Sequence, residues 1–247
     1  MEDKDPVPPQ AKPLNPLSIW VPIILIALGS VVLYNYLIFR SMQSVDERIE
    51  LPNGHSIKRP PFLGRLEKDM EFTERSGKKV HLADLKGKVL IASWVFTRCP
   101  RGCAGVLAKL KKLHEEFKNH PGVHFLSFTL DPEDTPELMR KFAEGIGIKD
   151  SDPWWFLNGE RDVVRQFMTL QMKFRPVQDL PLEDRLTPDD KYIHDLRVAV
   201  IDHQGHLRGL YDIMNADSQT SSFYDEALRD ELTYFLQQRD AGSTTKP

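Results

Sequence analysis

The chain of 247 residues contains two cysteines, Cys99 and Cys103, which lie together in the segment FTRCPRGCA at residues 96–104. Thiolates attack disulfides and also bind soft metal ions, so the pair predicts either redox chemistry or a metal site. Three residues separate the two cysteines, whereas the common redox motif has two residues at this place. If a helix begins near Pro100, residues four apart share one face and the sulfurs lie side by side. That geometry allows a disulfide and equally a soft two-sulfur clamp that suits Cu(I).

The surroundings of the two cysteines are expected to favour the thiolate form. A helix N-terminus presents free N–H groups and a partial positive charge. Arg98 and Arg101 add cationic side chains beside the pair. We therefore expect lowered cysteine pKa values, although this does not distinguish disulfide exchange from metal binding.

Two ligands seldom complete a selective metal site, so we look for a third donor among the eight histidines. His194 is a candidate by position, because it lies where a loop enters an apolar strand pattern near the end of the domain. On spacing alone it is one candidate among several. The other histidines are expected on an exposed hairpin (His203, His206), in solvent (His114, His120), in ordinary packing (His81, His124) and in a linker (His55).

The cysteine pair lies between a predicted buried strand and a predicted amphipathic helix. Residues 87–96 are an apolar run after a glycine, as in a strand buried on both faces, and residues 104–120 repeat apolar side chains at helical spacing. The rest of the pattern predicts a hairpin at 70–82, a strand at 123–130, helices at 134–147 and 160–174, a hairpin at 195–212 and a closing helix at 221–238. This order predicts an α/β fold with a central mixed sheet flanked by helices.

The N-terminal part of the chain predicts a single transmembrane helix. Residues 19–39 are 21 consecutive residues without a charge, enough to span the roughly 30 Å hydrocarbon core of a bilayer. A cleaved signal peptide and a buried soluble helix are weaker alternatives, because the run is long and apolar on all faces. Basic residues before and after the run barely differ, so charge does not set its orientation. The acidic, arginine-free leader argues against a mitochondrial transit peptide and favours a bacterial inner membrane.

Composition and segment character divide the chain into five parts and exclude some functions. We expect a leader (1–17), a transmembrane helix (18–40), a linker (41–62), a domain (63–238) and a disordered tail (239–247). The net charge of −3 argues against nucleic-acid binding. Two cysteines are too few for a disulfide scaffold, so their role should be local and chemical. No P-loop, G-x-G-x-x-G, H-E-x-x-H or serine elbow motif is present.

Four segments together resemble the SCO/SenC family of membrane-anchored, thioredoxin-fold proteins linked to copper delivery. The family's F-T-x-C-P-x-x-C segment is similar to residues 96–103, and its D-P-x-x-D-T-P-like segment is similar to LDPEDTPE at 130–137. Its opening strand pair resembles residues 70–89, and its late histidine before a strand and a turn resembles His194 followed by DLRVAVIDHQG. The likeness runs in order from about residue 62 to residue 212.

The resemblance implies a thioredoxin-like domain outside the cytoplasm. It implies that Cys99, Cys103 and His194 bind copper as Cu(I) or Cu(II), for the binuclear copper site of cytochrome c oxidase. The implied partner is the copper-bearing subunit of that oxidase or another copper protein. The chain departs from the family pattern at Ala104, where proline is frequent, and on both sides of the histidine, where it has Ile193 and Asp195. The Asp195 carboxylate is an expected hydrogen-bond partner of the imidazole.

Other functions remain open at this stage. A thiol–disulfide oxidoreductase would need Cys99 and Cys103 but not His194, and it could prepare a client's cysteines for copper. A thiol-dependent peroxidase is a related hypothesis, because some peroxidases share the thioredoxin fold. The third alternative is an anchored scaffold in which the two cysteines form an inert disulfide. The oxidoreductase and copper roles can coexist, because the same thiolates can hold copper or exchange electrons.

Overall fold

The structure, a computed structural model, describes residues 15–45, 48–100 and 102–244. It consists of two compact units, Met1–Arg48 and Ile49–Pro247, and each is described separately. Most of the predicted leader, residues 1–14, lies outside the described residues.

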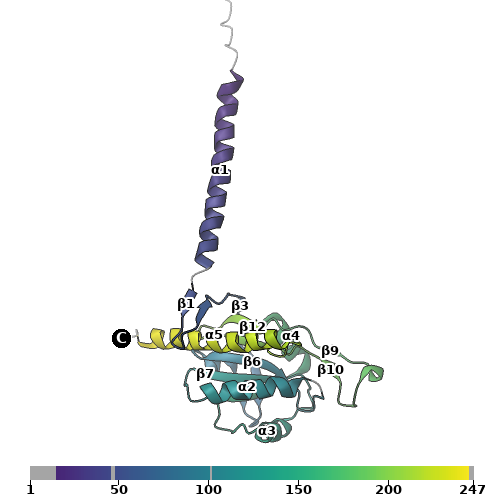
Figure 1. The fold of residues 1–247 in the computed structure, drawn as a ribbon. Helices are drawn as coiled ribbons and strands as arrows, with labels where there is room; N and C mark the ends of the chain where they lie inside the picture. The colour runs from purple at the N-terminus through teal and green to yellow at the C-terminus, as the bar shows by residue number, and fades with distance from the viewer. Residues whose placement is uncertain (1–14, 46–47, 101, 245–247) are drawn as a thin grey trace, which may run out of the picture. The chain divides into compact units, whose positions relative to one another are not determined.

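The first unit contains one long helix, α1 (Pro16–Val45) (Figure 1). Its segment Ile19–Arg40 has a mean hydropathy of 2.2 over its most apolar window, and none of that window is buried. By length and composition this helix can cross a bilayer, which is consistent with a membrane anchor. It extends beyond the predicted span 18–40 at both ends.

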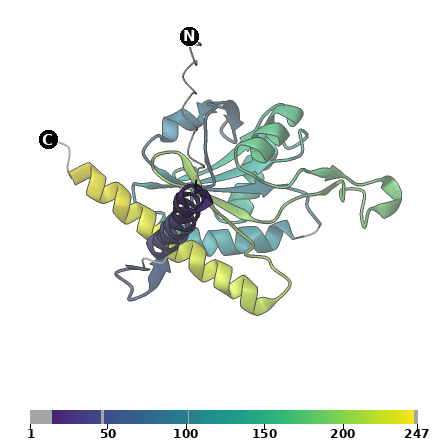
Figure 2. The same ribbon diagram turned by 90° about the horizontal axis from the view of Figure 1, so that it is seen from above.

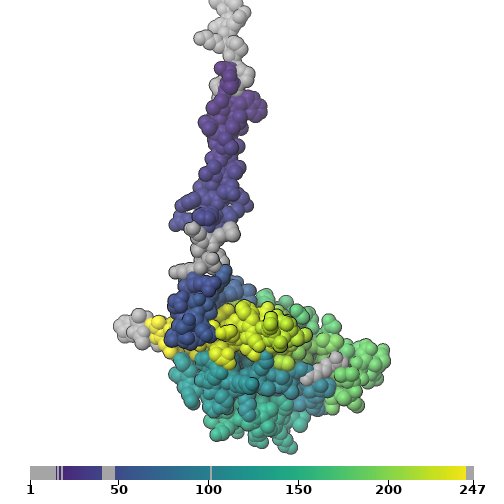
Figure 3. Space-filling view, viewed as in Figure 1, coloured from purple at the N-terminus to yellow at the C-terminus, as the bar shows by residue number. Residues whose placement is uncertain are grey.

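A small two-stranded sheet lies at the start of the second unit and pairs β1 (Arg48–Glu50), whose first residue ends the first unit, with β2 (Ser56–Lys58). Gly54, at φ 82°, supplies the left-handed residue that the turn between them requires. The hairpin lies against the C-terminal helix α5 (Ser218–Thr244) (Figure 3), where the side chains of Asn53 and His55 each bond to the Asp230 carboxylate at 2.9 Å. Part of the segment predicted as a linker, 41–62, is therefore folded onto the domain.

The centre of the domain is a mixed eight-stranded sheet of order β3-β12-β11-β6-β7-β8-β4-β5. Strands β6, β7 and β8 are parallel, and their neighbours are antiparallel. Every residue of β6 and β7 is buried, as the apolar runs predicted. The strands are β3 (Gly64–Arg65), β4 (Glu71–Glu74), β5 (Lys79–His81), β6 (Val89–Val95), β7 (Val123–Thr129), β8 (Trp154–Asn158), β11 (Val198–Ile201) and β12 (His206–Tyr211).

Helices cover both faces of this sheet (Figure 2). Helices α2 (Cys103–Phe117), α3 (Pro136–Gly145) and α5 pack on one face, in the cluster that contains Ile91 of β6. Helix α4 (Arg161–Leu170) and the short 3₁₀ helix η1 (Leu82–Leu85) pack on the other face, in the cluster that contains Leu90 and Trp94. Neighbouring residues of β6 thus point into different layers, as the pleat of a strand requires. The predicted α/β fold with a flanked mixed sheet is confirmed.

A second small sheet projects from the body of the domain (Figure 2). It pairs β9 (Gln178–Asp179) with β10 (Tyr192–Ile193), and the loop between them contains the 3₁₀ helix η2 (Leu182–Asp184). The Asp179 carboxylate accepts hydrogen bonds from Arg161 at 2.6 Å and from Arg165 at 3.1 Å, which tie the base of this hairpin to α4. His194 follows β10 directly and precedes β11, so the position of this hairpin helps to determine where the histidine lies.

Two local expectations are wrong. The tail predicted to be disordered from residue 239 is helical as far as Thr244, and residues 245–247 lie outside the described residues. Arg239 Nε donates to the Gly87 carbonyl at 2.8 Å, and Asp240 bonds to His120 at 3.1 Å, so the last turns of α5 are held by the domain. His114, expected in solvent, is fully buried beside Phe125, because α2 packs this face onto the sheet.

Candidate metal centre

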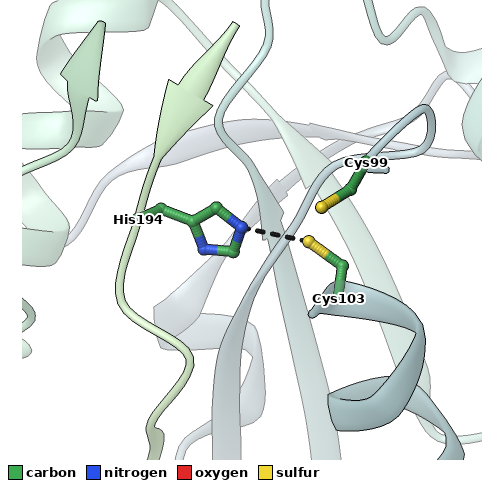
Figure 4. A group of neighbouring side chains, drawn as sticks. All are labelled: Cys99, Cys103 and His194. Atoms are coloured by element: carbon green, nitrogen blue, oxygen red, sulfur yellow. Dashed lines mark hydrogen bonds between the residues drawn. The ribbon is translucent and has the colours of Figure 1, made fainter. Parts of the chain in front are cut away.

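The structure brings together the three predicted ligands, Cys99, Cys103 and His194 (Figure 4). Their two sulfur atoms and one ring nitrogen all lie within 4.8 Å of one another. Cys103 Sγ is 3.0 Å from His194 Nε2. Cys103 is 3% exposed, Cys99 is half-buried, and the two are not joined in a disulfide. One sulfur of this group is therefore open toward solvent, and the other is covered.

Sheet pairing explains how a histidine 91 residues from Cys103 reaches the cysteines. Strand β11 runs antiparallel to β6, with Ala199 opposite Ala92. Because the strands are antiparallel, the segment that precedes β11 and carries His194 lies toward the end of β6, where the cysteine loop begins. The carboxyl ends of the parallel strands and the start of β11 thus meet at one edge of the sheet, where functional groups gather in α/β folds.

The loop before α2 differs from the predicted arrangement. Helix α2 begins at Cys103, not near Pro100, so Cys99 lies in a turn before the helix, with its backbone N–H bonded to the Phe96 carbonyl at 3.1 Å. The two sulfurs converge because this turn folds back over the helix N-terminus, and not because the cysteines share a helical face. Cys103 occupies the first position of the helix.

Asp134 holds the cysteine loop in place, a role that the sequence reasoning did not assign. Its buried carboxylate accepts hydrogen bonds from the Thr97 backbone N–H at 3.2 Å, from the Thr97 hydroxyl and from the Thr129 hydroxyl at 2.5 Å. The loop is thereby joined to the end of β7. The segment LDPEDTPE predicts a helix start with Asp134 or Thr135 as its cap; Thr135 is the cap, and Asp134 contacts the cysteine loop instead.

The expected lowering of the cysteine pKa is wrong for Cys103. A hydrogen bond to the Cys99 sulfur, together with burial, raises the pKa of the Cys103 thiol far above its ordinary value. The Arg98 guanidinium is engaged with carboxylates, at 2.9 Å from Asp131 and 2.8 Å from Glu133. The other expected cation, Arg101, lies outside the described residues. In the metal-free domain Cys103 is thus held as the thiol.

A carboxylate on the loop after β7 links the two halves of the site. Glu133 accepts from Arg98, which precedes Cys99, and from Lys191 at 2.7 Å, three residues before His194. The hydrogen bonds from Lys191 and Arg98 lower the pKa of Glu133 to about 2, so this carboxylate stays charged at neutral pH. The charged group holds the cysteine segment and the histidine segment near each other.

The orientation of the His194 ring follows from its second nitrogen. Nδ1 is 3.0 Å from the Asp195 backbone carbonyl, which can only accept, so Nδ1 carries the proton. Nε2 of the neutral ring then presents its lone pair to the cysteines. The expectation that the Asp195 carboxylate would orient the ring is wrong. That carboxylate bonds to Arg197 at 2.6 Å and to the Arg175 backbone N–H at 2.8 Å.

Asp195 is an ionised anchor of this loop. Burial favours its neutral acid, but the hydrogen bonds from Arg197 and from the backbone of Arg175 outweigh burial and hold its pKa below the ordinary value. The loop that carries His194 is therefore fixed by a charged group whose carboxylate is not used by the imidazole.

The donor set fits a soft metal ion. Two cysteine sulfurs and an imidazole nitrogen select Cu(I), Zn²⁺ and related ions over Mg²⁺ and Ca²⁺, which prefer oxygen. Histidine ligands commonly donate their second N–H to a carbonyl, as His194 does here. A second group in the described residues, His55 with Glu226 and Asp230, also brings three donor atoms together. There His55 Nδ1 is hydrogen-bonded to the Asp230 carboxylate at 2.9 Å and lies 3.5 Å from Glu226 Oε1.

The chain is similar to several known proteins. The SCO1/SenC family model matches residues 59–227. A SCO1 protein homolog of Bacillus subtilis is 35% identical over 108 residues, which cover 43% of this chain and 54% of that relative. The match therefore spans about half of the curated relative's length.

Two solved structures are similar to the domain. BsSco is a member of the Sco family of cytochrome c oxidase assembly proteins in which a disulfide switch has been identified. It is 25% identical, with a TM-score of 0.54 over 77% of this chain and 99% of that one. ScoI of Arabidopsis thaliana, solved with copper bound, is 20% identical, with a TM-score of 0.55 over 69% of this chain and 98% of that one, a likeness of fold.

Proposed function

The chain belongs to the SCO1/SenC family, and on that premise we propose that it is a copper-binding assembly factor. One copper ion is the cargo, and Cys99, Cys103 and His194 are its ligands. The observation that carries this proposal is that their three donor atoms converge within 4.8 Å from two distant parts of the chain. The copper-bound structure of Arabidopsis ScoI, which shares the fold, supports it.

The residues around the ligands prepare the site for its cargo. The Asp195 carbonyl holds the imidazole with Nε2 toward the sulfurs. Since Cys103 is held as a thiol by its neighbour and by burial, copper uptake must displace its proton. We therefore expect copper affinity to rise with pH. The half-buried Cys99 is the donor through which copper enters and leaves.

The proposed recipient is the copper-bearing subunit of cytochrome c oxidase or another copper protein. BsSco, which belongs to a family of cytochrome c oxidase assembly proteins, supports this recipient. We further propose that α1 anchors the chain in a bacterial inner membrane, with the domain on the extracytoplasmic side. Labelling of Cys99 by a membrane-impermeant maleimide in intact spheroplasts tests the sidedness. Labelling only after lysis would refute it.

Copper titration of the detergent-solubilised full chain under anaerobic conditions tests the copper site. We expect one equivalent of Cu(I) to bind tightly, and Cys99→Ser and Cys103→Ser each to weaken it strongly. His194→Ala should weaken Cu(II) more than Cu(I), because Cu(I) is well served by thiolates alone. His203→Ala, on the turn after β11, is the matched control and should bind like wild type. Absence of copper binding by wild type would refute the proposal.

A second candidate function is thiol–disulfide exchange, the only enzymatic activity that we propose for this chain. The observation that favours it is the pairing of a half-exposed Cys99 with a buried Cys103 to which it is hydrogen-bonded. Such a pair suits a nucleophile and a resolving thiol. An oxidoreductase should trap a mixed disulfide when Cys103 becomes Ser. Normal client maturation in a His194→Ala strain would favour this candidate over copper delivery.

A further inference from the structure

A groove between α2 and α3 opens directly beside the two cysteines. It has a volume of about 270 Å³. Both sulfur-bearing residues line it, but His194 does not, so the cysteines face the histidine on one side and the groove on another. Its remaining lining residues are Phe96, Thr97, Ala104, Leu107, Ala108, Lys111, Phe142 and Ile146.

The groove follows one face of α2. Ala104, Ala108 and Lys111 recur at spacings of four and three, so they lie in one row that starts beside Cys103. The two alanines are exposed and end at Cβ, which leaves the row open. Opposite them lie the half-buried side chains of Phe142 in α3 and of Ile146, which directly follows that helix. The result is an apolar channel that leads away from the thiols.

The positively charged Lys111 lies at the end of this row of α2 residues that is farther from the cysteines. Lys111 is half-buried, and its charge acts on the exposed Glu115 one turn further along α2, where it helps to lower the pKa of that carboxyl. The neighbouring Gly147 has no side chain, and a Cβ there would lie 2.9 Å from Lys111 Nζ. The apolar channel therefore has a thiol pair at one end and a positive charge at the other.

We propose that this groove binds the client segment that carries the cysteine reacting with Cys99. An apolar client side chain lies over Ala104 and Ala108, and a client carboxylate pairs with Lys111. The inference rests on the proposed function, because both require a client with reactive cysteines. At 270 Å³ the groove is smaller than the roughly 300–1,000 Å³ of small-molecule sites, which suits side chains of a bound polypeptide.

The dimensions of α2 define the spacing of the client motif. Cys103, whose sulfur lies within 4.8 Å of the reacting Cys99 sulfur, is eight residues from Lys111, or about 12 Å along a helix. An extended peptide covers that distance in about four residues, and its side chains at every second position share a face. We therefore infer a client pattern with an apolar residue two positions from the cysteine and Asp or Glu four positions from it.

Disulfide trapping with synthetic peptides tests the groove. The probe is the acetylated peptide Cys-Ser-Leu-Ser-Glu, carrying 2-nitro-5-thiobenzoate on its cysteine, mixed with the detergent-solubilised full-length Cys103→Ser variant. The Cys99 thiolate attacks the peptide sulfur and forms the Cys99–peptide disulfide. The bond to thionitrobenzoate breaks, and the coloured thiolate leaves with the electron pair, so no further oxidant is needed. Its absorbance gives the rate.

We expect the probe to react about tenfold faster than peptides in which Leu is replaced by Ser or Glu by Lys, in line with one buried apolar side chain or one charge contact. Adding Ala108→Leu, which fills the groove and keeps helix propensity, should remove the preference for Leu. Adding Lys111→Glu should reverse the preference, so that the Lys peptide reacts faster. Lys112→Glu, an exposed lysine of α2 outside the groove lining, is the matched charge control and should keep the original order.

Equal rates for all peptides, or equal effects of Lys111→Glu and Lys112→Glu, would overturn the proposal. A changed oligomeric state of Lys111→Glu without altered trapping would also overturn it and assign the groove to a second copy of the chain. Trapping by Cys99 involves no copper. A failed copper titration would therefore refute the proposed copper function. The relative trapping rates of the peptides would still show whether the groove binds the client segment.

Discussion

Glu231 of α5 should make the domain less stable as the pH rises through neutrality. Its side chain accepts a hydrogen bond from the buried Tyr211 hydroxyl, and burial raises its pKa from the ordinary 4.5 to about 7. The folded state therefore favours the protonated acid. Stabilisation from this group is fully present below pH 4.5 and is lost as the pH rises through 7.

The magnitude follows from the displacement of the pKa. At about 1.4 kcal/mol per pH unit, the change from 4.5 to about 7 corresponds to about 3 kcal/mol of unfolding free energy. For a domain of this size, that is a difference in melting temperature of about 6–12 °C. Glu231→Gln keeps the shape of the side chain and cannot ionise. Relative to wild type, the variant should gain only about 1 kcal/mol by pH 5 and about 3 kcal/mol by pH 8.

Thermal unfolding followed by circular dichroism at pH 5, 6, 7 and 8 measures this difference on the full chain in detergent. The difference between wild type and Glu231→Gln cancels the contributions of all other titrating groups. Glu144→Gln, which removes an exposed carboxyl on α3, is the matched control and should follow wild type at every pH. Parallel curves for wild type and Glu231→Gln would show that burial of this carboxyl does not control its protonation, and would refute the reasoning.

Two further substitutions test a buried hydrogen bond of the sheet and the support of the cysteine loop. Ser127→Ala removes the acceptor of the buried Trp154 Nε1–H, which lies 3.0 Å from Ser127 Oγ, and should lower the unfolding free energy by about 1–3 kcal/mol in urea titrations. Ser93→Ala, the other member of the buried Ser93–Ser127 pair, leaves that bond intact and should be milder, so equal losses would contradict the assignment. Asp134→Asn deprives Thr97 of a carboxylate acceptor and should weaken Cu(I) binding about tenfold or more without changing its stoichiometry. Unchanged affinity would show that the cysteine loop holds its position without Asp134.

Local patterns in the sequence were sufficient for the main elements of the fold. Apolar runs predicted the buried strands β6 and β7, because a strand covered on both faces has no polar side to display. Apolar spacing of 3–4 residues predicted α2, because its inner face packs on the sheet. The position of the cysteines between a central strand and a helix followed from these two patterns. The helix start near Pro100 was wrong, since the exact first turn depends on contacts of the loop with Asp134 and Phe96.

Local patterns could not reveal which side chains α2 and the loops would bury. His114 lies on a charged helix, and it is buried because its turn of α2 faces Phe125. The helix N-terminus and the neighbouring Arg98 and Arg101 in the sequence predict a lowered pKa for Cys103. In the folded domain the Arg98 guanidinium is bonded to the Asp131 carboxylate on the loop after β7. The Cys103 thiol is hydrogen-bonded to the Cys99 sulfur and buried, so its pKa rises.

The composition and spacing of the chain were enough to indicate an anchored α/β domain with a pair of thiols at a strand–helix junction, since length, hydropathy and periodicity are local properties. The choice of His194 among eight histidines came from position and from resemblance, and spacing alone did not make it. Its place beside Cys103 results from the antiparallel pairing of β11 with β6 and from the β9–β10 hairpin that precedes it. Such a contact joins segments far apart in the chain, so it exists only once the sheet has assembled and its register is set.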